Sequence, residues 1–321
     1  MKKIILHIGR HKSGTSSIQR FLSESVSLLE ENSILYPAVF RKGFAHHRLA
    51  GLLKRTEVRK LSADELTERV GSIRCQLHEI LESQYEVFVF SSEAFQNCNP
   101  KVVHRVFSNL GCDIHVACYF RDQASYLASA YNQKVHANIY DIPLDEFVDR
   151  FGGYYMKFAD NWAEFFSGFS AKVFNRNQLY KQNVIDDFFR NFLCLEIPEL
   201  DVFQELKNRD QNISLSAEIL SFKLELNKRV KRGQVSLENL KPEANNLYQA
   251  LAKMSGIDNS GKFSLNAELF SKIKQKFEEH NASFSSKYLN DVPLEFSAPG
   301  KGLPIITESR FEEIYREIFD R

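Results

Sequence analysis

Short apolar runs alternate with stretches of helical spacing over residues 1–205, and this alternation narrowly limits the folds open to the chain. The run Val87–Phe90 is apolar at every position, which is typical of a strand buried on both faces. Strands that alternate with helices pair in parallel as βαβ units. Strands are expected at 4–8, 34–37, 87–90, 114–120 and 171–174, and helices at 15–29, 64–83, 100–110, 122–131 and 184–193. The sequence therefore predicts an α/β fold with three layers, α/β/α, around a mostly parallel central sheet.

Beyond residue 205 the pattern changes to helices with polar connections. Helical spacing covers 215–230, 237–254 and 265–288, and a last helix is expected at 309–320. We therefore expect two parts: a core domain over 1–205, and a helical C-terminal extension over 206–321 that packs on the core.

The overall charge excludes one class of partner. Lys and Arg number 42 against 41 Asp and Glu, which gives a formal net charge of +1. A balance this close to zero argues against a broadly basic surface for nucleic acid, but it allows a local anion site.

Cysteine spacing and hydropathy bear on the cellular compartment. The five cysteines are scattered, with no CxxC pair and no His/Cys grouping suited to a metal. No apolar stretch approaches the roughly 20 residues of a membrane span. The start, MKKIILHIGR, lacks the long apolar run of a secretory signal. We therefore expect reduced thiols, no metal, no transmembrane segment and a cytoplasmic location.

The segment Gly9–Ser17 (GRHKSGTSS) lies between the first expected strand and the first expected helix. Its glycines let the backbone curl so that N–H groups converge, and the following helix N-terminus adds partial positive charge. Lys12 supplies a full charge, and Thr15, Ser16 and Ser17 supply hydroxyl donors. This combination predicts a site for a phosphate or a similar oxyanion.

The loop differs from the Walker A motif of P-loop NTPases, in which Gly-Lys precedes Ser or Thr. Here Lys12 comes two residues before Gly14, and Thr15 takes the position of the Walker lysine. The chain also lacks an Asp at the end of a buried strand to hold magnesium. A P-loop nucleotide kinase or NTPase stays open as one alternative, and a nucleotide-binding protein without catalysis as another.

A second polar element begins at Arg121, where an expected strand ends and a helix follows. Ligands of open α/β sheets bind at the carboxyl ends of the strands. The planar guanidinium of Arg121 suits a phosphate, and Ser129 lies two helical turns further on roughly the same face. We expect these two side chains to close on one phosphate group.

Two motifs together resemble the sulfotransferases that use 3′-phosphoadenosine 5′-phosphosulfate, with the bacterial-type carbohydrate enzymes as the nearest kind. The first is Lys12–Ser17 (KSGTSS), which is similar to the loop that binds the 5′-phosphosulfate in that family. The second is Arg121 with Ser129 and Tyr131, similar to the 3′-phosphate element, although Gln123 stands where the family has Pro and Tyr126 where it has Arg. The resemblance covers roughly residues 1–195 and implies a P-loop-like sulfotransferase fold.

The resemblance also implies roles for individual residues. Lys12 would stabilise charge on the bridging and leaving phosphate oxygens, and Arg121 with Ser129 would hold the 3′-phosphate. The cofactor-binding residues of the loop would be Arg10, Lys12, Ser13, Gly14, Thr15, Ser16 and Ser17. The acceptor would be a hydroxyl of a sugar or a glycolipid, the product would be 3′-phosphoadenosine 5′-phosphate, and no metal is required.

The base that takes the acceptor proton has two candidates. In the family that this chain resembles, a Glu at the end of the third strand often serves, and Glu93 follows Val87–Phe90 at that point. The tandem His46-His47 follows the second strand, and its loop could overhang the acceptor cleft. A tandem His usually has one packed ring and one solvated ring. A ring of the His46/His47 pair therefore stays open as the alternative base, and His47 is included among the candidate catalytic residues. His7 and His115, inside expected strands, are interpreted as core or supporting groups.

Overall fold

The computed structural model describes residues 1–198, 201–208, 214–236, 244–257 and 263–319. Within these residues the chain forms a five-stranded sheet of order β2-β3-β1-β4-β5, and every strand pairing in it is parallel. The strands are β1 (Lys3–His7), β2 (Ile34–Leu35), β3 (Val87–Ser91), β4 (Asp113–Phe120) and β5 (Gly168–Val173). All five expected strands are present, and the prediction of a parallel sheet is confirmed.

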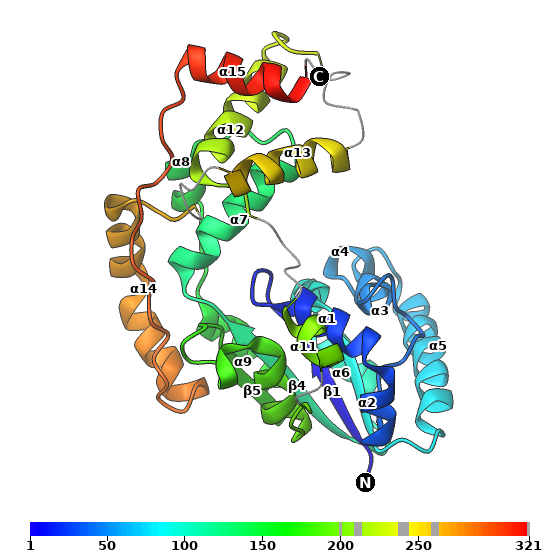
Figure 1. Ribbon diagram of the computed structural model, residues 1–321. Coiled ribbons are helices and arrows are strands. Elements are labelled where there is room, and N and C mark those ends of the chain that lie inside the picture. The colour runs from blue at the N-terminus through cyan, green and yellow to red at the C-terminus, as the bar shows by residue number, and fades with distance from the viewer. Residues whose placement is uncertain (199–200, 209–213, 237–243, 258–262, 320–321) are drawn as a thin grey trace. The chain divides into compact units, whose positions relative to one another are not determined.

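Helices cover both faces of the sheet (Figure 1). One face packs on α1 (Thr15–Glu24), α2 (Val26–Glu31) and α10 (Val184–Phe188). The other packs on α5 (Ala63–Leu81), α6 (Pro100–Phe107) and α9 (Tyr155–Ala163). Successive residues of β1 face opposite sides of the sheet. Ile4 and Leu6 pack in the core with α5, α6 and α9, and Ile5 packs in the core with α1, α2 and α10. The three-layer α/β/α fold predicted from the sequence is thus the observed one.

Several short elements complete this part of the chain. They are α3 (His47–Leu52), α4 (Arg55–Val58), η1 (Glu93–Asn97), η2 (Tyr180–Gln182), η3 (Phe189–Leu193) and α11 (Asp201–Asn208). The single helix expected over 184–193 is α10 followed by the π-helical turn η3.

The chain divides into two compact units. Unit 1 comprises residues 1–121, 154–211 and 280–294, and unit 2 comprises residues 122–153, 212–279 and 295–321. Each unit is described by itself. The helices of unit 2 are α7 (Gln123–Ala137), α8 (Leu144–Asp149), α12 (Ala217–Lys231), α13 (Ala244–Ile257), the first part of α14 (Ala267–Tyr288) and α15 (Glu308–Phe319). Residues 237–243, which belong to an expected helix, lie outside the described residues.

This division differs from the expected boundary at residue 205. The segment 122–153 leaves the sheet after β4 and joins the later helices, because the apolar face of α7 packs with α12 in one core. Leu127 and Tyr131 share that core with Ile219, and the Asn132 amide donates to the Leu215 carbonyl at 2.8 Å. The order of elements along the sequence predicted the helices but not which unit they join.

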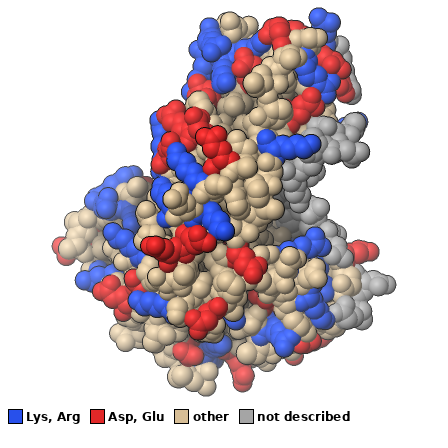
Figure 2. All heavy atoms as spheres, turned by 90° about the vertical axis from the view of Figure 1, so that its left-hand side faces the viewer, with Lys and Arg blue, Asp and Glu red and all other residues tan. Residues whose placement is uncertain are grey.

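The distribution of charged side chains on the surface can be compared with the net charge of +1. Both signs of charge are interspersed over the face seen in Figure 2, which presents no extended basic area. None of the helices in the described ranges has both the length and the apolar character needed to cross a bilayer.

Candidate functional site

The turn from β1 into α1 needs glycine at two positions. Gly9 and Gly14 have φ values of 38° and 73°. A Cβ at Gly9 would lie 2.8 Å from Thr15 Oγ1, and a Cβ at Gly14 would lie 2.7 Å from a ring carbon of Phe174. Lys12 also has a positive φ, of 67°. The loop therefore curls tightly at the carboxyl end of β1, as the motif predicts.

Two hydroxyls of the loop turn inward rather than outward. Ser13 Oγ donates to the Arg10 carbonyl at 2.6 Å, and Thr15 Oγ1 donates to the same carbonyl at 3.2 Å. Both residues are buried, whereas Ser16 is exposed and Ser17 half-buried. Ser13 and Thr15 thus hold the shape of the loop in this structure, and Ser16 is the hydroxyl that faces solvent.

The N-terminus of α1 lacks an internal anion. Gly14 is its N-cap, no side chain accepts a hydrogen bond there, and the first turn contains no acidic residue. The first N–H groups of a helix have no partner within the helix, and they carry the positive end of its dipole. This end of α1 is therefore suited to an anion supplied from outside.

Lys12 and Arg121 come together from neighbouring strands. Arg121 follows β4, which pairs with β1, and its Nη1 donates to the Lys12 carbonyl at 3.3 Å. Tyr155 Oη donates to the Arg121 carbonyl at 2.7 Å, which anchors this strand end. Burial and the charge of Arg121 lower the pKa of Lys12. The charge of Arg121 acts unfavourably on that of Lys12, and an anion bound near both would offset this repulsion.

Arg10 has a different environment from the one expected of a phosphate ligand. Its guanidinium lies 4.8 Å from the ring centres of both Tyr155 and Phe158, and 5.7 Å from that of Phe120. These are cation–π distances. In this structure Arg10 ties the loop to the aromatic residues of β4 and α9.

Arg121 and Ser129 fall in different units. Arg121 is the last residue of the first stretch of unit 1, and Ser129 lies half-buried on α7 in unit 2. Tyr131, which matched the family element, is fully buried and donates to the Ile142 carbonyl at 2.9 Å. Tyr131 is therefore a core residue of unit 2.

Glu93 and His47 lie side by side next to the end of β3. Glu93 begins η1, two residues after the end of β3, and His47 begins α3. His47 Nε2 is 3.9 Å from Glu93 Oε1, and the two side chains are 38% and 21% exposed. His47 Nδ1 is 2.8 Å from the Ser92 hydroxyl, which orients the ring. The two candidates for the base, predicted as rivals, form one cluster.

Gln19 is a member of this cluster that the sequence analysis did not single out. It lies on the buried face of α1, and its Nε2 donates to Glu93 Oε2 at 3.0 Å and to the Ser91 hydroxyl at 3.3 Å. A polar residue between the core residues Ile18 and Phe21 was the signal that could have identified it. Gln19 holds one carboxylate oxygen of Glu93 and leaves the other toward His47.

His46 has a structural role, as one ring of a tandem pair was expected to have. It is fully buried, its Nδ1 accepts from the Ser91 N–H at 3.1 Å, and its Nε2 lies 2.9 Å from the Pro37 carbonyl. We assign the proton to Nε2, because Nδ1 already accepts a hydrogen bond. Burial lowers the pKa of His46 to about 3. The ring therefore stays neutral and fastens the His46 loop to β3.

His7 is likewise a core residue. Its Nδ1 lies 2.8 Å from the Ser91 hydroxyl, and burial lowers its pKa to about 4. Burial lowers the pKa of His11, in the loop, and the charge of Glu93 opposes this shift. A Cβ at Gly9 would lie 3.3 Å from the Glu93 Cα, so the β1–α1 loop and the Glu93 cluster border one another in unit 1.

Comparison with known proteins leaves the chain without a family assignment. No protein-family model matches it, and neither does any curated protein. Among solved structures, it is similar to a chain from work titled "Molecular and structural characterization of the PezAT chromosomal toxin-antitoxin system of the human pathogen Streptococcus pneumoniae". The identity is 17%, the match covers 73% of this chain and 87% of that one, and the TM-score is 0.27. An overlap at this score carries no argument about fold or function.

Proposed function

We propose that the chain is a sulfotransferase, which moves a sulfuryl group from 3′-phosphoadenosine 5′-phosphosulfate to a hydroxyl of a carbohydrate or glycolipid. The observation that carries the proposal is the hydrogen bond from the Arg121 guanidinium to the Lys12 backbone carbonyl, beside the uncapped N-terminus of α1. Two cations and a helix N-terminus at the carboxyl edge of a parallel sheet form an anion site. The motifs in Lys12–Ser17 and at Arg121 supply the choice of donor.

The proposed chemistry is an in-line transfer. The acceptor oxygen forms a bond to sulfur while the bond between sulfur and the 5′-phosphate oxygen breaks, and 3′-phosphoadenosine 5′-phosphate leaves. Lys12 stabilises the charge that grows on the leaving oxygen, and backbone N–H groups at the start of α1 hold the 5′-phosphate. Arg121, in unit 1, is the proposed ligand of the 3′-phosphate.

The proton of the acceptor goes to the Glu93 cluster. In our proposal Glu93 is the base, because Gln19 fixes one of its oxygens and the other is directed toward the partly exposed His47. His47, 3.9 Å away, stabilises the negative charge of Glu93 when its ring is protonated. Buried His46 takes no part in proton transfer.

Two measurements test the proposal. Calorimetry should show that 3′-phosphoadenosine 5′-phosphate binds about ten- to a hundredfold more tightly than adenosine 5′-phosphate, since a charged hydrogen bond is lost with the 3′-phosphate. Radiolabelled donor should transfer sulfate to extracted surface glycans. Equal affinity for the two nucleotides would refute the donor assignment, and magnesium-dependent ATP binding would favour the kinase alternative.

Lys12→Ala separates binding from catalysis. The variant should lose more in kcat than in affinity for the spent nucleotide, because the charge that Lys12 stabilises develops only in the transition state. Lys60→Ala, which removes an exposed lysine paired with Glu57, is the control and should retain wild-type activity. A rise in KM with unchanged kcat would make Lys12 a simple binding residue.

A further inference from the structure

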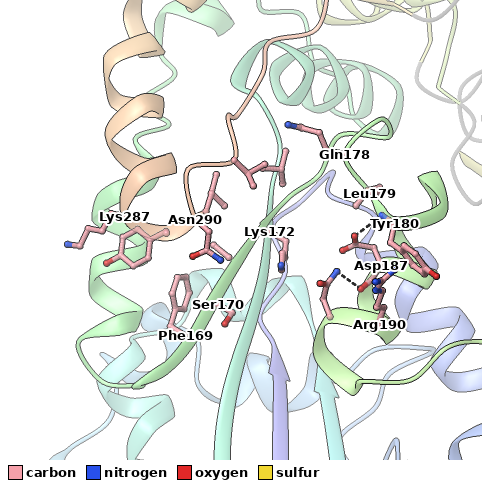
Figure 3. Close-up of a pocket in the computed structure, with 16 residues that line it drawn as sticks. Phe169, Ser170, Lys172, Gln178, Leu179, Tyr180, Asp187, Arg190, Lys287 and Asn290 are labelled. Carbon is pink, nitrogen blue, oxygen red and sulfur yellow. Dashed lines mark hydrogen bonds between the residues drawn. The ribbon is translucent and has the colours of Figure 1, made fainter.

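A cavity of about 600 Å³ follows the free edge of β5 in the sheet of the described residues. Its wall includes five consecutive strand residues, 169–173. Because successive residues of a strand face opposite sides of the sheet, a cavity that touches all five must run along the edge of the strand. Figure 3 shows the lining side chains arriving from β5, from 178–191 on one side and from 287–292 on the other. All of these residues belong to unit 1.

The backbone of β5 offers hydrogen-bonding groups to this cavity. β5 is the last strand in the sheet order and pairs only with β4 in the sheet of the described residues. The Phe174 N–H donates to the Phe120 carbonyl at 2.7 Å, so alternate residues on the N-terminal side of Phe174 point their backbone groups toward β4. The N–H and C=O groups of Ala171 and Val173 therefore point outward, to the cavity.

One side of the cavity is cationic. Lys172 pairs with Tyr119 of β4, so both side chains face the helices on that side of the sheet, where Asp187 of α10 and Arg190 of η3 also line the cavity. The Asp187 carboxylate already accepts hydrogen bonds from the Tyr119 hydroxyl at 2.5 Å and the Tyr180 N–H at 2.9 Å. Arg190 stacks on the Tyr180 ring, 4.0 Å from its centre. Lys172 and Arg190 thus give this side its net positive charge.

The opposite side is largely apolar. Phe169 packs against Tyr288 with ring centres 5.6 Å apart, and Leu289 and Val292 continue this wall. Lys287 also belongs to the lining, but its ammonium forms an ion pair with Asp160 at 2.7 Å and points away from the other lining residues in Figure 3. The two sides of the strand edge therefore present different chemistry.

We propose that this cavity binds an extended acidic segment of another protein, which adds to the sheet as a strand beside β5. Main-chain groups of Ala171 and Val173 would pair with the segment, as in other cases of strand addition. Side chains of an added strand alternate between the two sides. The segment therefore carries acidic residues at every second position, facing Lys172 and Arg190, and apolar residues between them, facing Phe169 and Leu289.

The first test uses a fluorescein-labelled peptide of alternating Glu and Val, measured by fluorescence anisotropy with the full-length protein. We expect saturable binding, and at least tenfold weaker binding when Lys replaces Glu. Lys172→Ala and Arg190→Ala should each weaken binding about three- to tenfold. Arg176→Ala, which removes an exposed arginine outside the cavity lining, is the matched control and should bind as the wild type does.

The second test distinguishes strand pairing from simple charge attraction and needs no protein variant. In an extended peptide, the N–H groups of alternate residues point to the same edge, so only the Glu set or only the Val set faces β5. Methylating the backbone nitrogens of one set should abolish binding, and methylating the other set should leave it nearly unchanged. Equal effects of the two sets would overturn the proposed strand addition.

Other outcomes would overturn the choice of partner. Free glutamate can be added at a concentration that supplies as many side-chain carboxylates as the peptide does. If it saturates the cavity at that concentration, the cavity is a site for small anions. Concentration-dependent dimerisation that Lys172→Ala abolishes, seen by sedimentation without peptide, would make a second copy of this chain the occupant. Absence of saturable peptide binding would overturn the proposal as a whole.

Discussion

The polar residues at the carboxyl edge of the sheet differ in whether their side-chain polar atoms already have hydrogen-bond partners within the fold. Ser13, Thr15 and His46 are buried, with their polar atoms in contact with backbone atoms of the same unit. Glu93 and His47 keep part of their side chains in solvent and lie against each other. Residue type alone would have given all five a possible ligand role. Burial and existing hydrogen bonds separate those that maintain the framework from those that can meet a substrate.

Gln19 is expected to act as a positioning residue for Glu93. Gln19→Leu keeps the size of the side chain but removes the donor to Glu93 Oε2, so the carboxylate loses its fixed orientation. We expect kcat for sulfate transfer to fall about tenfold while KM for the donor stays constant. Glu93→Gln should lower kcat by about 10²–10⁴-fold, as loss of a base does. A Gln19→Leu enzyme with full kcat would exclude this role, and Gln19→Asn serves as a test of partial rescue.

The two most deeply buried histidines predict a loss of stability in mild acid. Burial lowers the pKa of His7 to about 4 and that of His46 to about 3, from 6.5. Between pH 6.5 and these lowered pKa values, the two histidines bind protons in the unfolded chain but not in the folded chain. The contribution of the two neutral rings to the free energy of unfolding is therefore fully present above pH 6.5. It falls as the pH drops toward 4, by up to ~1.4 kcal/mol per pH unit for each ring.

Urea unfolding at pH 7.5 and pH 5.5 measures this effect. We expect the free energy of unfolding to be about 2–3 kcal/mol lower at pH 5.5. The window lies above the range in which carboxylates with ordinary pKa values titrate. His78→Gln, at an exposed position on α5, should show the same pH dependence as the wild type. Equal stability at the two pH values would contradict the burial of neutral rings.

At the scale of elements, the turn between β1 and α1 joins local sequence to tertiary packing. Gly14→Ala would place a Cβ 2.7 Å from Phe174 and force a positive φ on a residue that disfavours it. We expect a loss of about 1–3 kcal/mol in the free energy of unfolding, together with weaker nucleotide binding. Gly71→Ala is the matched control, because no atom outside α5 lies within 4 Å of its added Cβ. That variant should gain about 0.5–1 kcal/mol, as expected in a helix interior. Denaturant unfolding of both variants measures these changes in the free energy of unfolding. Equal changes for Gly14→Ala and Gly71→Ala would contradict a special constraint at the turn.

At the scale of the whole molecule, the described residues form separate hydrophobic cores for the two units. The two clusters on either side of the sheet contain residues of unit 1 alone, and the third cluster contains residues of unit 2 alone. Trp162, the one tryptophan of the chain, is buried in unit 1. Its fluorescence therefore reports on one core, whereas far-UV circular dichroism reports on helices of both.

Core variants should act on these two signals differently. Phe222→Ala removes a fully buried ring from the unit 2 core, at a cost of about 3–5 kcal/mol. We expect part of the helical signal to be lost at lower denaturant while the Trp162 transition stays near its wild-type midpoint. Phe88→Ala, in a core of unit 1, should shift the Trp162 transition instead. Coincident transitions for both signals in the Phe222→Ala variant would contradict separate unfolding.

The sequence by itself determined the sheet and the turn between β1 and α1, because both depend on local order. Apolar runs such as Val87–Phe90 can be satisfied only in a buried strand, and the glycines of the β1–α1 turn define a conformation within nine residues. The same locality explains why the carboxyl ends of β1, β3 and β4 could be expected at one edge of the sheet, with Lys12, Glu93 and Arg121 there.

Only the tertiary structure decided which polar atoms remain available and which elements share a core. The proximity of His47 and Glu93 depends on where α3 and η1 pack, and the role of Gln19 depends on a contact 74 positions away in the sequence. The transfer of 122–153 to unit 2 follows from side-chain packing between α7 and α12, which no local pattern encodes. The cavity beside β5 arises in the same way, because a strand becomes an edge only through the order in which strands pair. Such contacts join residues far apart in the chain, so periodicity and motif spacing, which are local, carry no record of them.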